Sequence, residues 1–202
     1  MMQARKPSYR FATAIAPLLL LLSSAAPARS QQVTFADLDK AIIEAHVVRQ
    51  QVVRRDGREF PVRNESELKL VIGPGTKIQQ TWTPTTHSAR GTKRGEAGTS
   101  SFTLEQSRDV GSQGGGKALY LFAEGTLTFM RTFKGGAFKR TIAFSRGKDG
   151  LTCVAAESFA REEGVGPITL DSWTDGAPVT IVSWKQLSST CRITADKPSA
   201  TP

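Results

Sequence analysis

The sequence is poor in the side chains that most often carry out catalysis. Its 202 residues include two histidines, two cysteines and two tyrosines. No G-x-S-x-G motif marks a serine nucleophile, and two thiols without a neighbouring Cys or His cannot complete a tetrahedral zinc site. The sequence therefore indicates no catalytic residue, no metal site and no cofactor, and it favours a protein that is not an enzyme.

Acidic residues are also few, with 18 Asp and Glu against 27 Lys and Arg and a formal net charge of +9. Residues 1–30 contain four of the basic side chains and no acid, so the charge of the remainder falls to +5. A dedicated nucleic-acid binder needs a denser basic stripe. We expect no nucleic-acid partner; the mild excess suits a protein that meets anionic surfaces.

Long apolar runs are absent except for one near the N-terminus. Arg5, Lys6 and Arg10 precede the run "FATAIAPLLLLLSSAA", and small residues follow at 26–28. This order predicts a cleavable signal peptide over residues 1–30 and a periplasmic or secreted protein. The run is too short and too interrupted for a good membrane span, so we expect no span in the mature chain.

The predicted compartment indicates the oxidation state of the two cysteines, Cys153 and Cys191. Export places them in an oxidising environment, where a disulfide between them is expected. A loop at "QLSS" would place Trp184 opposite Cys191, so that Cys191 points into an apolar layer.

Residues 31–194 have the pattern of a single β domain, and residues 195–202 that of a disordered tail. Thr34 is placed to cap a short helix running towards Ala45. After it, β-branched and aromatic runs alternate with turn signals such as Asp56-Gly57, which predicts about ten strands in an antiparallel meander. We expect a closed barrel rather than a sandwich.

Alternation along these strands predicts which side chains share a face. A three-residue turn at 123–125 would place Lys117 opposite Arg131, and a turn at Gly135-Gly136 would place Arg131 opposite Arg140. These three form a basic row above the apolar rows, and Glu157 lies diagonal to Arg140. Phe133 and Phe138 extend the same face beyond the row. Like charges opposite one another destabilise a sheet unless water, an acid or an anionic ligand lies between them.

Two interpretations of the basic row stay open. In the first, the three cations ring the open end of a barrel and Glu157 partly neutralises them. In the second, they form with Phe133 and Phe138 the mouth of a ligand site for an anionic amphiphile or glycan.

The second interpretation predicts an exported binding module whose partner is an anionic lipid, a glycan or another envelope component. An alternative is a structural or interaction protein that docks through the polar segments 83–99 and 107–117. A hydrolase of envelope polymers is a further alternative, for which Asp171 and Asp175 or Glu162 and Glu163 are the candidate carboxylate pairs. The oligomeric state stays open.

Four segments, "VVRRDGREFPV", "GTLTFMRTFKGGAFKRTIAFS", "LTCVAAESFARE" and "SSTCR", resemble a group of small exported bacterial proteins of unknown function. The resemblance covers most of the mature chain and implies an exported, β-rich domain with two cysteines; it transfers no activity. In outline the meander is also similar to lipocalin-like barrels, although the usual lipocalin signature near the first strand is missing.

Overall fold

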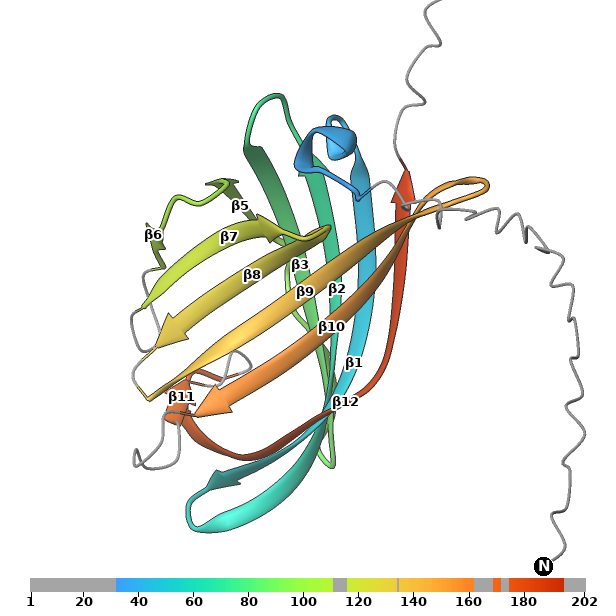
Figure 1. The fold of residues 1–202 in the computed structure, drawn as a ribbon. Coiled ribbons are helices and arrows are strands. Elements are labelled where there is room, and N and C mark those ends of the chain that lie inside the picture. The colour runs from blue at the N-terminus through green and yellow to red at the C-terminus, as the bar shows by residue number, and fades with distance from the viewer. Residues whose placement is uncertain (1–31, 111–115, 134, 162–168, 172–174, 195–202) are drawn as a thin grey trace, which may run out of the picture.

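The chain folds into two antiparallel β-sheets, which confirms the predicted all-β class (Figure 1). The structure is a computed structural model that describes residues 32–110, 116–133, 135–161, 169–171 and 175–194. The predicted signal peptide and the predicted C-terminal tail lie outside the described residues. No helix in the described part of the chain is long and apolar enough to cross a membrane.

The larger sheet, sheet A, has the order β11-β12-β1-β2-β3-β4, and β5 also pairs with β3. Its strands are β1 (Ile42–Arg55), β2 (Arg58–Ile72), β3 (Lys77–Ser88), β4 (Gly91–Arg94), β5 (Gly98–Thr103), β11 (Thr169–Asp171) and β12 (Pro178–Thr194). The smaller sheet, sheet B, has the order β10-β9-β8-β7-β6. Its strands are β6 (Arg108–Asp109), β7 (Lys117–Ala123), β8 (Thr126–Phe133), β9 (Gly136–Gly147) and β10 (Gly150–Arg161).

The N-terminal part of the domain follows the sequence signals closely, except for the helix. Asp56 and Gly57 both have positive φ and connect β1 to β2 in a two-residue turn, as predicted. Thr34 begins only one turn of 3-10 helix, η1 (Phe35–Leu38), and β1 already starts at Ile42. The helix was predicted too long because the β-branched residues after it pair with β2 instead.

The polar segments expected to be loops are mostly extended. The segment 83–99 includes the end of β3, all of β4 and the start of β5. It forms strands because its Thr side chains suit an edge position, where one face meets water. Of the second segment, 107–117, residues 111–115 lie outside the described ones.

The prediction of a closed barrel is not supported, because neither sheet closes on itself in the described residues. The strands of sheet B cross those of sheet A, and β10 lies against β12 along one seam (Figure 1). Side chains join this seam. The Ser189 hydroxyl donates to the Ala155 carbonyl at 2.7 Å, and Arg161 donates to the Ile181 and Val182 carbonyls at 2.5 and 2.6 Å.

The Cys153–Cys191 disulfide crosses the same seam, with 5.6 Å between the two Cα atoms. It confirms the disulfide predicted from the two cysteines, and it links β10 of sheet B to β12 of sheet A. The expected route was wrong in one respect, since the segment "QLSS" makes no turn. β12 continues through it as one long strand beside β1, with register shifts opposite Val48/Arg49 and Val52/Val53.

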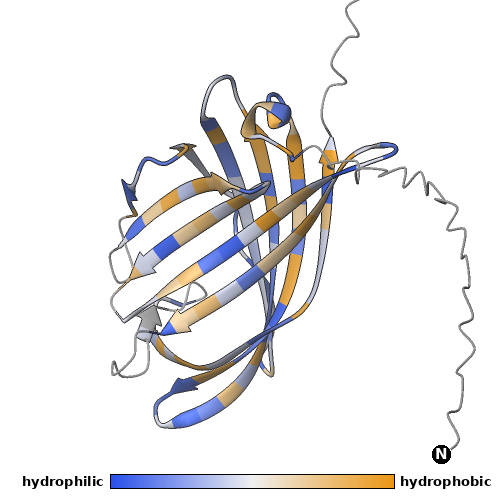
Figure 2. Cartoon of the chain, viewed as in Figure 1, coloured by the Kyte–Doolittle hydropathy of each residue, from blue (hydrophilic) through white to orange (hydrophobic). Residues whose placement is uncertain are grey.

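The hydrophobic core lies between the two sheets. Apolar and polar residues alternate along the strands, so each sheet presents an apolar face to the other (Figure 2). The largest side chains that are fully buried in this core include Tyr120, Leu38, Ile43, Leu70, Ile72, Ile78, Leu127 and Ile142. The core ends partway along β1 and β2, where polar side chains replace apolar ones on the same inner face.

Candidate functional site

A cluster of charged side chains lies between the sheets at the edge of the core. Glu157 on β10 is its centre, with a side chain that is 0% exposed. Its Oε1 accepts from Arg140 Nε at 2.7 Å, and its Oε2 accepts from Arg49 Nη1 at 3.0 Å. Arg49 Nη1 also donates to the hydroxyl of Ser66. One carboxylate thus binds two guanidinium groups, one from each sheet.

Strand pairing explains how the cluster forms. Glu157 lies directly opposite Arg140 in the β9–β10 ladder, and Arg49 reaches it from β1 across the gap between the sheets. The backbone N–H of Glu157 also donates to Gln186 Oε1 at 2.6 Å. Burial lowers the pKa of Arg49, while the attraction of Glu157 opposes that shift.

Arg131 differs from the other two arginines because no described residue pairs with it. It lies on β8 opposite Phe138, one diagonal step from Arg140, which is opposite Phe129. Its Nε is buried and has no hydrogen-bond partner. Burial lowers the pKa of Arg131. A buried N–H without an acceptor is costly, so this side chain is the one most in need of an anionic partner.

Aromatic rings surround these arginines. The Trp184 and Phe159 rings stack with centroids 5.5 Å apart, and Phe159 stacks on Phe133 at 5.4 Å. The guanidinium of Arg49 lies 4.8 Å from the Trp184 ring centroid, and that of Arg140 lies 5.4 Å from the Phe138 centroid. Such cation–π contacts hold the guanidinium planes in place without supplying an anion.

The charged cluster and the rings enclose a cavity of about 340 Å³ between the sheets, here called the inter-sheet cavity. Its lining comprises Arg49, Gln51, Ser66, Gln80, Trp82, Ser100, Phe102, Val110, Phe129, Arg131, Phe133, Phe138, Arg140, Phe159, Ile181 and Trp184. Three arginines and no carboxylate appear in that lining. Even with Glu157 behind them, the described charges leave an excess of two positive charges.

Three buried N–H donors around the inter-sheet cavity have no hydrogen-bond partner among the described residues: Arg49 Nε, Arg131 Nε and Trp184 Nε1. By contrast, the phenol of Tyr120 donates to Gln80 Oε1, and burial raises the pKa of Tyr120. The cavity thus combines aromatic walls with unused donors and positive charge. Chemically, it can accept a small ligand that has an anionic or strongly accepting group and an apolar body.

Most of the residues predicted to form the site lie together in the structure. Arg131, Arg140, Phe133 and Phe138 line the inter-sheet cavity, and Glu157 binds Arg140. Arg131 and Arg140 are diagonal rather than directly opposite each other, because β8 and β9 pair two residues away from the expected register.

The placement of Lys117 was wrong. Ala118, not Lys117, is opposite Arg131, and Lys117 is exposed on the outer face of β7. The reason is the β7–β8 turn, in which Glu124 and Gly125 both have positive φ and form a two-residue turn. A three-residue turn had been expected, and a shift of one residue turns a strand's side chains to the other face.

Sequence reasoning missed the residues that sheet A contributes. Arg49 lies on β1, where its alternation with Val47 and Gln51 places all three on one face. Trp184 was expected to lie opposite Cys191, but it pairs with Gln51 on β1. No local signal reveals which distant strand faces sheet B.

Neither candidate hydrolase pair falls wholly within the residues that the structure describes. Asp175 pairs with Arg55, away from the inter-sheet cavity, and residues 162–163 lie outside the described ones, as does the side chain of Asp171. The single carboxylate at the cavity, Glu157, is held by two arginines. No group of three or more potential metal ligands occurs among the described residues.

Comparison of the chain with protein-family models, with curated proteins and with solved structures finds no match. The geometry of the inter-sheet cavity is therefore the basis for a functional proposal.

Proposed function

We propose that this protein binds a small anionic ligand with an apolar or aromatic body in the inter-sheet cavity. The observation that carries the proposal is the set of three buried N–H donors, on Arg49, Arg131 and Trp184, to which no residue in the described part of the chain supplies an acceptor. An anionic group placed among them would satisfy donors whose burial otherwise destabilises the fold. Hydrogen bonds to charged groups are the stronger kind, which favours an anion over a neutral acceptor.

The size of the inter-sheet cavity narrows the ligand class. At about 340 Å³, it lies at the small end of the range of about 300–1,000 Å³ for small-molecule sites. A free carboxylic acid with one ring or a short chain suits this volume better than a complete phospholipid or a glycan. The rings of Phe138, Phe159 and Trp184 would contact its apolar part.

The proposal places this binding outside the cytoplasm. The basic, apolar and small-residue order of residues 1–30 supports export. The Cys153–Cys191 disulfide is compatible with an oxidising compartment.

Titration of short carboxylic acids tests the proposal. Trp184 and Trp82 line the inter-sheet cavity, so their fluorescence should change when hexanoate or phenylpropanoate binds. Arg131→Met should weaken binding by roughly tenfold to a hundredfold, because a charge-assisted hydrogen bond is lost. Lys117→Met removes the same charge from the outer face and should bind like the wild type.

Two outcomes would contradict the proposal. One is equal binding of these acids by the wild type and the Arg131→Met variant. The other is equal binding of hexanoate and of the neutral hexanamide, since the buried donors would then show no preference for an anion.

A further inference from the structure

A second cavity continues the concave face of sheet A beyond sheet B. The β1–β2 hairpin extends past β10 (Figure 1), and with β3, β4 and the start of β12 it encloses about 460 Å³. We call this space the hairpin pocket. Its floor is apolar, built from Val53, Val62, Val179, Ile181 and Phe60.

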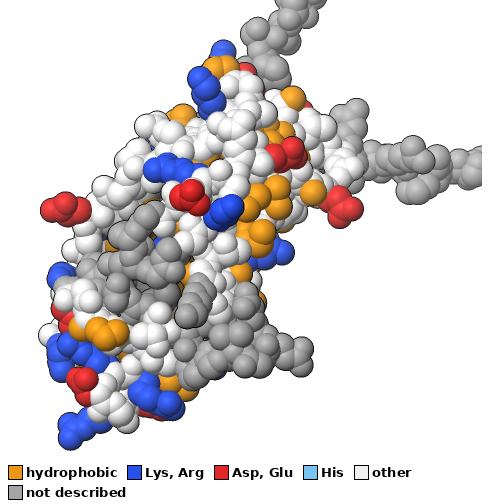
Figure 3. Space-filling model, turned by 90° about the vertical axis from the view of Figure 1, so that its left-hand side faces the viewer, with side chains coloured by type: hydrophobic (Ala, Val, Ile, Leu, Met, Phe, Trp, Pro, Cys, Tyr) orange, Lys and Arg blue, Asp and Glu red, His pale blue; other side chains and the backbone are white. Residues whose placement is uncertain are grey.

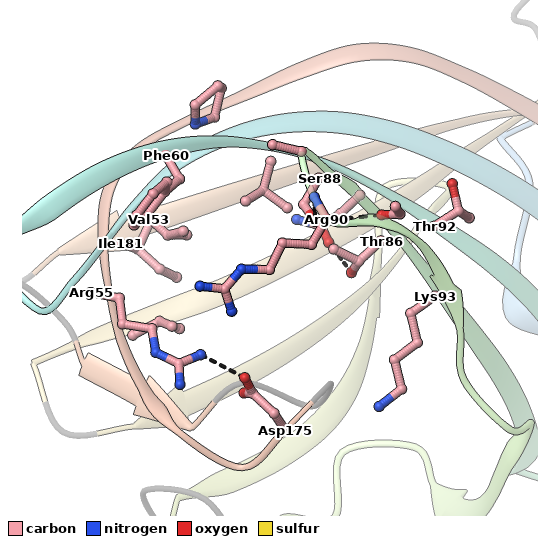
Figure 4. A pocket seen from close by; sticks show the side chains of 16 residues that line it. Val53, Arg55, Phe60, Thr86, Ser88, Arg90, Thr92, Lys93, Asp175 and Ile181 are labelled. Carbon is pink, nitrogen blue, oxygen red and sulfur yellow. Dashed lines mark hydrogen bonds and ion pairs between the residues drawn. The ribbon is translucent and has the colours of Figure 1, made fainter.

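Charged side chains lie around the opening of the hairpin pocket. Arg55 binds Asp175 at 2.5 Å, and the Arg90 side chain extends into the same opening (Figure 4). Lys and Arg side chains also gather at the end of the molecule where the β1–β2 hairpin lies (Figure 3). The pocket thus has a mainly basic rim above an apolar floor, and this floor can bury an apolar chain.

The two cavities meet at Ile181, which lines both. On β1, the successive inward-facing residues Gln51 and Val53 line the inter-sheet cavity and the hairpin pocket respectively. Asn64 of the hairpin pocket donates to Gln51 Oε1 at 2.6 Å. Since both cavities lie along one face of the same strands, side chains rather than a strand of sheet A divide them.

We infer that the inter-sheet cavity and the hairpin pocket form one elongated site for a linear amphiphile such as a medium-chain fatty acid. The acid group lies at Arg131, and the apolar chain passes Ile181 onto the floor formed by Val53 and Val62. The inference rests on the proposed function, because the same donors hold the acid. It adds the shape of the ligand and its direction in the site.

Strand geometry sets the length that such a chain must have. Arg49 and Val53 are four residues apart on β1, a distance of about 13 Å at roughly 3.3 Å per residue. A short acid held at the arginines ends before the hairpin pocket, whereas a longer one enters it. Each methylene group that becomes buried there should tighten binding by at most about fourfold, until the pocket is filled.

Calorimetric titration with hexanoate and dodecanoate, below the concentrations at which they form micelles, tests the inference. The wild type should bind dodecanoate at least roughly tenfold more tightly than hexanoate. Val62→Trp fills the hairpin pocket from a half-buried position and should remove that preference, leaving hexanoate binding within about twofold of the wild type. Val154→Trp, at an outward-facing position that is 67% exposed, is the matched control and should keep the preference.

The outcomes separate the two proposals. If hexanoate and dodecanoate bind the wild type equally and both depend on Arg131, the elongated site is wrong and the proposed function stands. If Val62→Trp keeps the wild-type preference for dodecanoate, the chain does not enter the hairpin pocket and the inference is again wrong. If neither acid binds, or if Arg131→Met binds both unchanged, the proposed function fails and the inference fails with it.

Discussion

The region around Glu157 and the region around Arg131 share one inner surface but treat buried charge in opposite ways. Around Glu157, two guanidinium groups meet one carboxylate, with N–O distances of 2.7 and 3.0 Å to Arg140 and Arg49. Around Arg131, no described residue supplies an acceptor. Both regions border the same cavity, and Arg131 is partly exposed there whereas Arg140 and Glu157 are buried.

The comparison separates a structural role from a binding role. A carboxylate that binds buried arginines contributes to the fold, because its removal leaves those charges uncompensated. A buried arginine N–H without an acceptor destabilises the folded protein until a ligand supplies one, and strain of this kind is typical of functional sites. We therefore assign Glu157 to the fold and Arg131 to the ligand, although the two are separated by a single strand.

Substitution of Glu157 should have the largest effect. Glu157→Gln leaves Arg49 and Arg140 buried without a counter-charge, and we expect the free energy of unfolding to fall by about 3–5 kcal/mol. Urea unfolding followed by fluorescence measures this change. The control is Glu67→Gln, since Glu67 pairs with Arg94 at 2.6 and 2.8 Å on the exposed surface. That loss should stay below about 1 kcal/mol, and equal losses would contradict the distinction.

Substitution of Arg131 should affect stability far less. Arg131→Met removes a partly buried charge that no described residue pairs with, and it keeps most of the apolar side chain. The free energy of unfolding should therefore equal that of the wild type or exceed it by up to about 1 kcal/mol. Arg140→Met is the matched comparison, because it removes one of the two partners of Glu157 and should destabilise the protein. The same urea unfolding applies to both. Strong destabilisation by Arg131→Met would mean that Arg131, too, belongs to the fold.

The sequence predicted correctly which side chains point inward wherever the error in strand register was an even number of residues. The β8–β9 and β9–β10 ladders both lie two residues from the expected register, and Arg131, Arg140 and Glu157 still point inward. The β7–β8 ladder lies one residue away, which puts Lys117 outside. Side chains alternate between the two faces of a sheet, so an odd change in the number of turn residues moves the next strand's side chains to the opposite face. An even change keeps them on the same face and alters only which residue on the adjacent strand they pair with.

The pairing between the sheets could not be predicted in the same way. Arg49 and Trp184 are far from Arg131 in sequence, and no turn residue records that their strands face sheet B. Their contacts depend on how β12 runs beside β1 through two register shifts. The turn read into "QLSS" hid this path, because Ser residues suit both turns and edge-strand positions. Half of the cavity wall was therefore missing from the predicted site.

A water-exposed carboxylate offers the mildest test of the contrast. Asp37 Oδ2 accepts from the Thr34 N–H at 2.7 Å, and its Oδ1 binds Arg146 at 2.6 Å. The backbone hydrogen bond from Thr34 is the main cause that lowers the pKa of Asp37 from 3.8. A carboxyl whose pKa is lower in the folded than in the unfolded state stabilises the fold at pH values above the unfolded pKa. This stabilisation is lost as the pH falls through the folded-state pKa.

Asp37→Asn should therefore reduce the free energy of unfolding by about 1 kcal/mol near neutral pH and by much less near pH 3. Unfolding in urea at both pH values measures the change. An equal loss at both pH values would mean that the shape of the Asp37 side chain, and not its charge, holds η1 in place. Ion pairs would then contribute less to the stability of this fold than the region around Glu157 indicates.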